Sequence, residues 1–181
     1  MNTLIAGSLR LEPQCQAHAE EMFAVLRDPA IYEFENEAPL SVDVLRDRYA
    51  RMELRLSPDG TEHWLNWVIR LPGGELAGFL QATVLARGRA YVAYELASRF
   101  WRQGLASTSL QAVLRELATH YSVREAFAVL KSANYRSRGL LDKLGFTPLA
   151  DTEPAPWAQE PDEFTLHKAL FAGESAAESA A

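Results

Sequence analysis

The sequence predicts a layered fold of strands and helices, of the α/β or α+β class. Segments with alternating apolar residues are interspersed with longer ones whose apolar residues fall at helical spacing, in the order β, α, α, β, β, β, α, β, α, β, β. The chain has 181 residues, of which 48% are hydrophobic and 23% charged, and this composition suffices for one sizeable core. We therefore expect a single folded unit.

The first part of the chain predicts a strand at residues 9–13 and two helices. The first helix ends at Asp28-Pro29, and its apolar residues are Ala19, Met22, Phe23 and Leu26. The second helix is expected to start with Ser41 as N-cap and to end at residues 57–60. Its buried residues are expected to be Leu45, Tyr49, Met52 and Leu56.

The middle of the chain predicts a hairpin and a third strand. Apolar and other residues alternate over positions 65–71, and the Pro-Gly-Gly turn at 72–74 leads into a partner strand. Trp64 and Trp67 then lie on opposite faces of the first of these strands. The third strand covers residues 90–96 and leads through a turn into an amphipathic helix with Leu110, Val113, Leu114 and Leu117.

The last part predicts a buried strand at 126–130 and a helix opened by Asn134 and terminated by Gly145. Residues 146–149 and 163–170 are expected to pair as edge strands around a Pro-rich connection. We expect residues 171–181 to form a disordered tail, because positions 172–181 carry no large apolar side chain.

Composition excludes several classes of function. A lone Cys15 and four widely separated histidines suggest neither a disulfide framework nor a metal site. The start of the chain has no signal-like segment, and no run reaches the ~18 apolar residues of a membrane span, so we expect a cytoplasmic protein without a membrane partner. A net charge of −6 argues against nucleic-acid binding and is compatible with cationic partners such as amines.

The segment at residues 94–107 carries the strongest functional signal. A strand that passes through a turn of small residues into a helix start directs several unpaired N–H groups and a positive dipole end at one spot, which favours an anion. Gly104 and Ala106 are small enough to let phosphates approach. A Gly-x-Ala turn before a helix also occurs where nothing binds, so this signal alone is weak.

A second segment, residues 134–146, lies about thirty positions further along the chain. Together the two segments resemble the Gcn5-related N-acetyltransferase (GNAT) superfamily, most closely the branch that acetylates ribosomal-protein N-termini and assorted small amines. Trp101, Gly104 and Ala106 match the signature of that branch, whereas Arg102 and Thr108 replace its usual Gly and Glu. The resemblance implies a mostly antiparallel central sheet with helices on both faces, and one N-acetyltransferase domain at residues 1–170.

The resemblance further implies that acetyl-CoA donates its acetyl group directly to a primary amine, on a small molecule or a protein N-terminus, without a metal. Homodimers are common in the superfamily. The loop would hold the pyrophosphate and Asn134 the pantetheine arm, with Ser137 on the same helix face; alternatively, Asn134 only caps its helix. The residues expected to contact the cofactor are Leu96, Ser98, Arg102, Gln103, Gly104, Leu105, Ala106, Ser107, Asn134 and Ser137.

Acetyl transfer requires a neutral amine, and an alkyl amine with a pKa of ~10.4 needs more help to lose its proton at pH 7 than an α-amine at ~8. Glu95, on the strand that leads to the loop, is the expected base or amine-orienting residue; the alternative is that it faces solvent. Many relatives have a tyrosine at the position of Leu141 that protonates the thiolate, and here that role is unfilled or passes to Ser137 or Tyr135. The N–H of Leu96 would polarise the acetyl carbonyl.

Two further alternatives stay open at this point. Glu33, Glu35 and Glu37 would attract a cationic acceptor or form a solvated acidic loop. The whole domain, with its altered loop and Leu141, would be an enzyme or a non-catalytic acyl-CoA-binding module that senses the cofactor.

Overall fold

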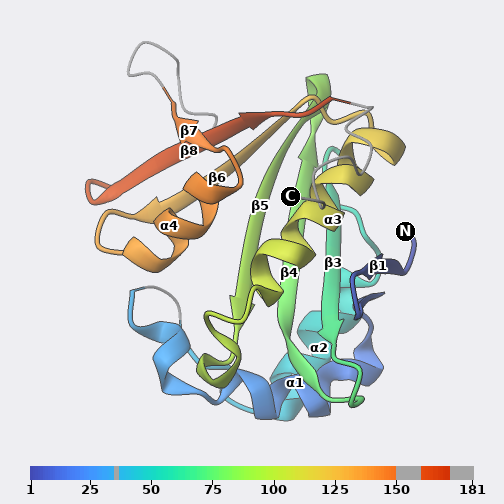
Figure 1. The fold of residues 1–181 in the computed structure, drawn as a ribbon. Helices are drawn as coiled ribbons and strands as arrows, with labels where there is room; N and C mark the ends of the chain where they lie inside the picture. Colours follow the sequence, from blue (N-terminus) through green and yellow to red (C-terminus); the bar gives the residue numbers. More distant parts are fainter. Residues whose placement is uncertain (35–36, 150–159, 172–181) are drawn as a thin grey trace.

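The computed structural model describes residues 1–34, 37–149 and 160–171. It contains one eight-stranded sheet in the order β1-β2-β3-β4-β5-β6-β8-β7 (Figure 1). The strands are β1 (Leu4–Ala6), β2 (Leu9–Pro13), β3 (His63–Arg70), β4 (Leu76–Leu85), β5 (Arg89–Leu96), β6 (Glu125–Lys131), β7 (Thr147–Pro148) and β8 (Glu163–Ala169). The α-helices are α1 (Ala19–Leu26), α2 (Val42–Met52), α3 (Leu105–His120) and α4 (Tyr135–Lys143).

The neighbouring strands β5 and β6 are the parallel pair among the described strands, and the other pairs are antiparallel. Their pairing covers Arg89 to Tyr91 of β5 and Glu125 to Phe127 of β6. Beyond it the strands diverge, as Figure 1 shows, while β5 stays paired with β4 up to Leu96. Among the described strands, one edge of the second half of β5 therefore has no partner.

Helices cover both faces of the sheet, as expected. Helix α3 lies on the face of Trp67: the Trp67 Nε1 of β3 donates to the Asn2 carbonyl at 3.0 Å, and the Asn2 amide donates to Glu116 of α3 at 3.1 Å. Helix α2 lies on the opposite face, that of Glu95, whose charge adds to burial in raising the pKa of Tyr49 on α2. The core lies between these layers and is built around Trp67, Leu80, Leu110, Leu117, Leu141 and Leu166.

The ends of the helices follow the expected capping chemistry. The Ser41 hydroxyl accepts a hydrogen bond from the Val44 N–H at 3.2 Å and caps α2. At the end of α4, Gly145 has φ +77°, and the Phe146 N–H donates to the Leu141 carbonyl at 3.0 Å, which completes a Schellman motif.

Three expectations need correction. The strand β1 was not predicted; it has only three residues, and its stability comes from pairing with β2. Leu56 is 43% exposed and outside α2, which ends at Met52 before Arg55 turns the chain with φ +58°. β8 pairs with β7 as expected but is not an edge strand, because its other side pairs with β6.

The tail at 172–181 and most of the Pro-rich connection lie outside the described residues. Within the described part of the chain, no helix has the length and apolar character needed to cross a bilayer.

Candidate active site

The turn between β5 and α3 presents a run of unused backbone donors. Within the described residues, none of the N–H groups at positions 102–107 donates a hydrogen bond, and the Thr108 N–H is the first to do so, to the Gly104 carbonyl at 3.0 Å. No side chain caps α3, and its first turn holds no acidic residue. The helix start thus offers six successive amides and an uncompensated positive dipole end to an external acceptor.

Backbone conformation explains how the turn exposes these amides. Arg102 and Gly104 have φ values of +60° and +78°, and two left-handed residues in a short loop curl successive N–H groups toward one side. Glycine adopts this conformation without strain, whereas an arginine does so at a cost. A Cβ at Gly104 would meet no atom within 4 Å, so the space beside the loop is open.

The loop is held in place from behind. The Trp101 indole Nε1 donates to the Leu96 carbonyl at 2.7 Å, and Gln103 Nε2 donates to the Arg99 carbonyl at 2.8 Å. The Ser98 N–H donates to the Asp28 carboxylate at 2.6 Å, and this bonding, led by the Ser98 side chain, lowers the pKa of Asp28. These contacts fix the loop without using the amides of residues 102–107.

The contacts that hold the loop change which atoms of Ser98 and Ser107 are open to a cofactor. Ser98 was expected to contact the cofactor, but its N–H is taken by Asp28, so any contact would come from other atoms. The Ser107 hydroxyl donates to the Gly104 carbonyl at 2.8 Å, which leaves its backbone N–H for a ligand. Leu105 and Ala106 are half-buried within the first turn of α3, where their amides are also unused.

Strand register directs the Leu96 N–H toward the divergence of β5 and β6. The next residue, Ala97, donates to the Ala77 carbonyl of the β4 side at 3.0 Å. Because N–H directions alternate along an antiparallel ladder, the N–H groups of Leu96 and Tyr94 point away from β4. They face the side on which β5 has no strand partner.

Gly78 on β4 allows β5 to take this position. A Cβ at Gly78 would lie 2.0 Å from the Glu95 carbonyl oxygen and 2.7 Å from the Leu96 Cα, closer than any side chain permits. This glycine was not identified from the sequence, although an isolated glycine inside a strand pattern signals close backbone approach.

Asn134 caps α4, which confirms the structural role that the sequence left open for it. Its Oδ1 accepts a hydrogen bond from the Ser137 N–H at 3.1 Å. Its Nδ2 has no acceptor within hydrogen-bonding distance among the described residues, so a contact with a ligand stays a prediction. Ser137 is half-buried one turn along the helix, and Leu141 is 1% exposed in the core, where it offers no proton.

A tyrosine hydroxyl nevertheless lies near α4. Tyr94 of β5 donates a long hydrogen bond, 3.5 Å, to the Ser137 carbonyl. Burial raises the pKa of Tyr94 to about 12, so its hydroxyl stays protonated at neutral pH. Tyr135, in contrast, is 65% exposed and packs edge-on against the Phe34 ring. Sequence reasoning missed Tyr94, since helical spacing cannot show which strand residue meets a helix.

Glu95 lies on the opposite face from Tyr94, because side chains alternate along a strand. It is half-buried, and its charge, after burial, contributes to raising the pKa of Tyr32 to about 12. Ala93, two residues earlier on the same face, is exposed although β5 is an interior strand, so none of the described helices covers the sheet there. Glu95 therefore borders an uncovered part of this face.

Polar groups continue across this face from Ala93. Gln81 of β4 pairs with Ala93, and Asn66 of β3 pairs with Gln81. Asn66 is 4% exposed, and within the described residues neither its amide oxygen nor its amide nitrogen has a hydrogen-bond partner. Buried amides without partners are costly, which is a reason to expect a ligand or water on this face.

Arg136 of α4 connects the parts of the site. Its guanidinium pairs with the Glu33 carboxylate and lies 4.7 Å from the centre of the Trp101 ring and 5.6 Å from that of Phe34. Glu33 is thus engaged by an arginine, Glu37 is exposed and Glu35 lies outside the described residues. Arg102, in the loop itself, is exposed and forms no ion pair within the described residues.

A known protein family matches this sequence. The model of the acetyltransferase (GNAT) domain matches residues 8–147, which is more than half of the chain. No curated protein matches the sequence.

Several solved structures share the fold. RimL, a ribosomal L7/L12 alpha-N-protein acetyltransferase in complex with coenzyme A, is 18% identical and has a TM-score of 0.78, over 95% of this chain and 100% of its own. An acetyltransferase of the GNAT family from Bacillus anthracis is 14% identical (TM-score 0.73; 93% and 98% covered). A ribosomal-protein-S5-alanine acetyltransferase from Vibrio fischeri is 13% identical (TM-score 0.75; 94% and 97%). Because the family model matches most of the sequence and the sheet has the fold of these structures, this chain belongs to the GNAT acetyltransferase family.

Proposed function

We propose that residues 1–170 act as one N-acetyltransferase domain, which moves the acetyl group of acetyl-CoA directly to a primary amine. The observation that carries this proposal is the run of six unused amides at positions 102–107, located where β5 and β6 diverge. A diphosphate is the anion that such a curled run of donors at a helix start fits best. Bound acetyl-CoA would supply an activated acyl group on a thiol with a pKa near ~8.5.

The residues around the divergence fit the rest of such a ligand. The loop amides and Arg102 would hold the phosphates, and the unpaired edge of β5 with the Asn134 amide would hold an arm that carries peptide-like groups. The Leu96 N–H, directed away from β4, is placed to polarise a carbonyl at the end of that arm. These donors come from the loop, from β5 and from the start of α4, and the fold holds each of these elements in place.

The acceptor would approach from the other face of β5, where Ala93 leaves the sheet uncovered and Glu95 borders the gap. Glu95 would take or orient the proton of the amine, directly or through water. Tyr94, on the side of α4, would donate a hydrogen bond to the departing thiol, a role for which Leu141 has no group. Ser137 stays a second candidate for that role.

The comparisons suggest which amines to test first. Two structures of the same fold are a ribosomal L7/L12 alpha-N-protein acetyltransferase and a ribosomal-protein-S5-alanine acetyltransferase, although identities of 13–18% extend the likeness only to the fold. An α-amine also needs less help to lose its proton than a lysine side chain. We therefore propose peptide N-termini and small primary amines as the acceptor class.

Release of free thiol from acetyl-CoA, measured across a library of amines and peptides, tests this function. Wild type should turn over at least one acceptor, and Glu95→Gln should lower kcat by about 10² to 10⁴ while leaving CoA affinity unchanged. Glu20→Gln, an exposed glutamate on α1, is the matched control and should retain full activity. Calorimetric binding of CoA without turnover of any acceptor would favour a cofactor-sensing module instead.

A further inference from the structure

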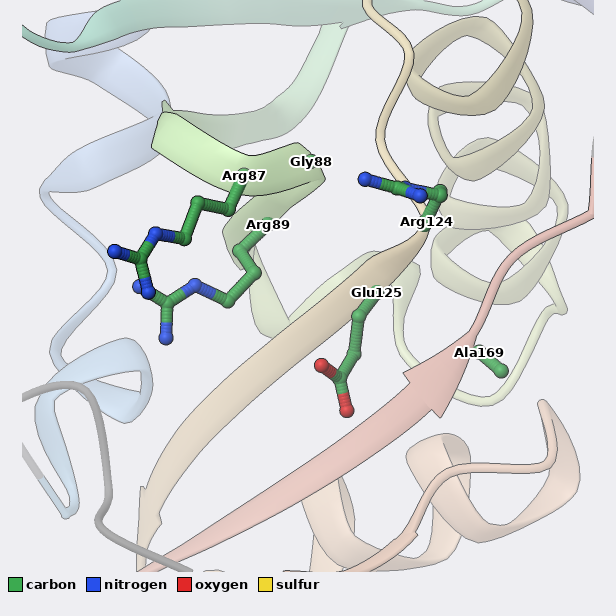
Figure 2. Close-up of a pocket in the computed structure, with 6 residues that line it drawn as sticks. All are labelled: Arg87, Gly88, Arg89, Arg124, Glu125 and Ala169. Atoms are coloured by element: carbon green, nitrogen blue, oxygen red, sulfur yellow. The ribbon is translucent and has the colours of Figure 1, made fainter.

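A second basic feature lies at the opposite end of β5 from the loop. A hollow of about 370 Å³ lies where β5 and β6 begin and β8 ends, and Figure 2 shows the residues that line it. Its lining residues are Arg87, Gly88, Arg89, Arg124, Glu125 and Ala169. None of them belongs to the candidate active site.

The backbone around the hollow is tied together by hydrogen bonds. The Arg124 N–H donates to the Gly88 carbonyl at 2.7 Å, and the Leu170 N–H donates to the Arg124 carbonyl at 2.8 Å. Gly88 has φ +71°, and a Cβ there would lie 2.9 Å from the Ser122 carbonyl oxygen, so this close contact requires glycine. Three segments that are distant in the sequence thus form one fixed frame.

The three arginines on this frame lack carboxylate partners. Within the described residues, none of them forms an ion pair, and the Nε of Arg89 is buried without an acceptor. Figure 2 shows Arg87 and Arg89 extending to one side of the hollow, with Arg124 across from them. Glu125, the carboxylate in the lining, is hydrogen-bonded to His167 Nδ1 at 2.8 Å.

Three arginines line this one hollow, although the chain carries a net charge of −6. Elsewhere some arginines, such as Arg70 and Arg136, are paired with glutamates, and others, such as Arg27 and Arg115, are exposed without an ion pair among the described residues. Guanidinium groups bind phosphate oxygens through paired N–H donors and remain charged at any physiological pH. A buried guanidinium N–H without a partner adds a local reason for an acceptor to bind here.

We propose that this hollow binds a phosphorylated small molecule with two or more negative charges, at a site separate from the loop at residues 102–107. The guanidinium groups supply the charge, and the hydrogen-bonded frame around Gly88 fixes the backbone that carries them. The proposal does not depend on the acetyltransferase function.

Titration with inorganic pyrophosphate, followed by backbone amide shifts in NMR at about 0.1 M salt, tests the proposal. The amides of Gly88 and Glu125 report on the hollow, whereas those of Gly104 and Ala106 report on the loop. We expect saturable shifts at the hollow in wild type. The variant Arg87→Gln/Arg89→Gln/Arg124→Gln should bind at least about tenfold more weakly there, with the loop response unchanged.

A matched variant controls for overall charge. Arg27→Gln/Arg51→Gln/Arg115→Gln removes the same three charges from exposed positions with no ion pair among the described residues, and should keep the affinity at the hollow within about twofold. If the first triple variant unfolds, Arg87→Gln/Arg124→Gln changes exposed residues alone. Absence of saturable shifts at the hollow in wild type, or equal weakening in both triple variants, would overturn the proposal.

Discussion

The starts of α3 and α4 are built in opposite ways, although both follow strands that border the same divergence in the sheet. At α4, the Asn134 Oδ1 accepts the Ser137 N–H at 3.1 Å, as a side-chain cap normally does. At α3, Gly104 provides no cap, and six successive amides are unused within the described residues. A cap contributes ~1 kcal/mol, so α3 forgoes stability at the position where an anion would replace the cap.

Giving α3 a cap of its own should have the largest effect on this contrast. Gly104→Asp places a carboxylate over the free amides, which should weaken CoA binding by about 100-fold or more, equivalent to ~2.7 kcal/mol. Gly104→Asn has the same shape and a similar tolerance of the left-handed conformation but no charge, and should lose much less. Calorimetry of both variants measures the difference; equal affinities would show that no anion binds at this helix start.

Adding a Cβ at Gly78 should test whether the fold depends on the close approach of β4 and β5. Gly78→Ala puts a Cβ 2.0 Å from the Glu95 carbonyl oxygen, and should destabilise the fold by about 2 to 3 kcal/mol because β4 and β5 must move apart. Gly73→Ala, in a turn where a Cβ meets no atom within 4 Å, is the control and should be nearly neutral. Urea unfolding of both variants checks this, and a stable Gly78→Ala protein would contradict the close approach.

The cap at α4 can be separated from a ligand contact by two substitutions. Asn134→Ala should lose ~1 kcal/mol of stability, whereas Asn134→Ser keeps a capping oxygen and should regain it. If the Asn134 amide also donates to the cofactor, Asn134→Ser should still bind CoA about fivefold more weakly, the equivalent of one hydrogen bond. Full CoA affinity in Asn134→Ser would leave Asn134 with capping alone.

The anchor behind the loop should give the smallest effect and a distinctive pH dependence. Hydrogen bonds led by Ser98 lower the pKa of Asp28 below its unfolded value of ~3.9, so the ionised form stabilises the fold at higher pH. This contribution should be complete above about pH 5 and vanish as the pH falls through the folded pKa. We expect Asp28→Asn to cost ~1 kcal/mol at pH 7 and progressively less as the pH falls through the folded pKa of Asp28, by thermal unfolding. A difference that stays constant with pH would exclude the carboxylate as the cause.

Elements with strong periodicity could be predicted from the sequence, as could features with local chemical causes. The Ser41 cap, the Gly145 terminator and the turn before α3 each depend on residues within a few positions of one another. What could not be predicted depends on pairing in space. The divergence of β5 and β6, the contact of Tyr94 with α4 and the bond from Ser98 to Asp28 join residues far apart in the chain.

The same limit applies to the cations near the site. Arg136 and Lys131 lie close to the candidate cofactor segments in the sequence, but in the fold Arg136 pairs with Glu33, and Lys131 with Asp162 at 3.0 Å. Arg102 in the loop keeps its charge unpaired among the described residues. Counting the basic residues near these segments would therefore overstate the positive charge open to a ligand.

The most direct test of the central claim is an amide NMR titration with CoA. The N–H signals of residues 102–107 should shift together and saturate at one CoA per chain, whereas the Ser98 amide, bonded to Asp28, should move little. Saturable CoA binding that leaves the amides of residues 102–107 unmoved would contradict the claim that this helix start is the diphosphate site.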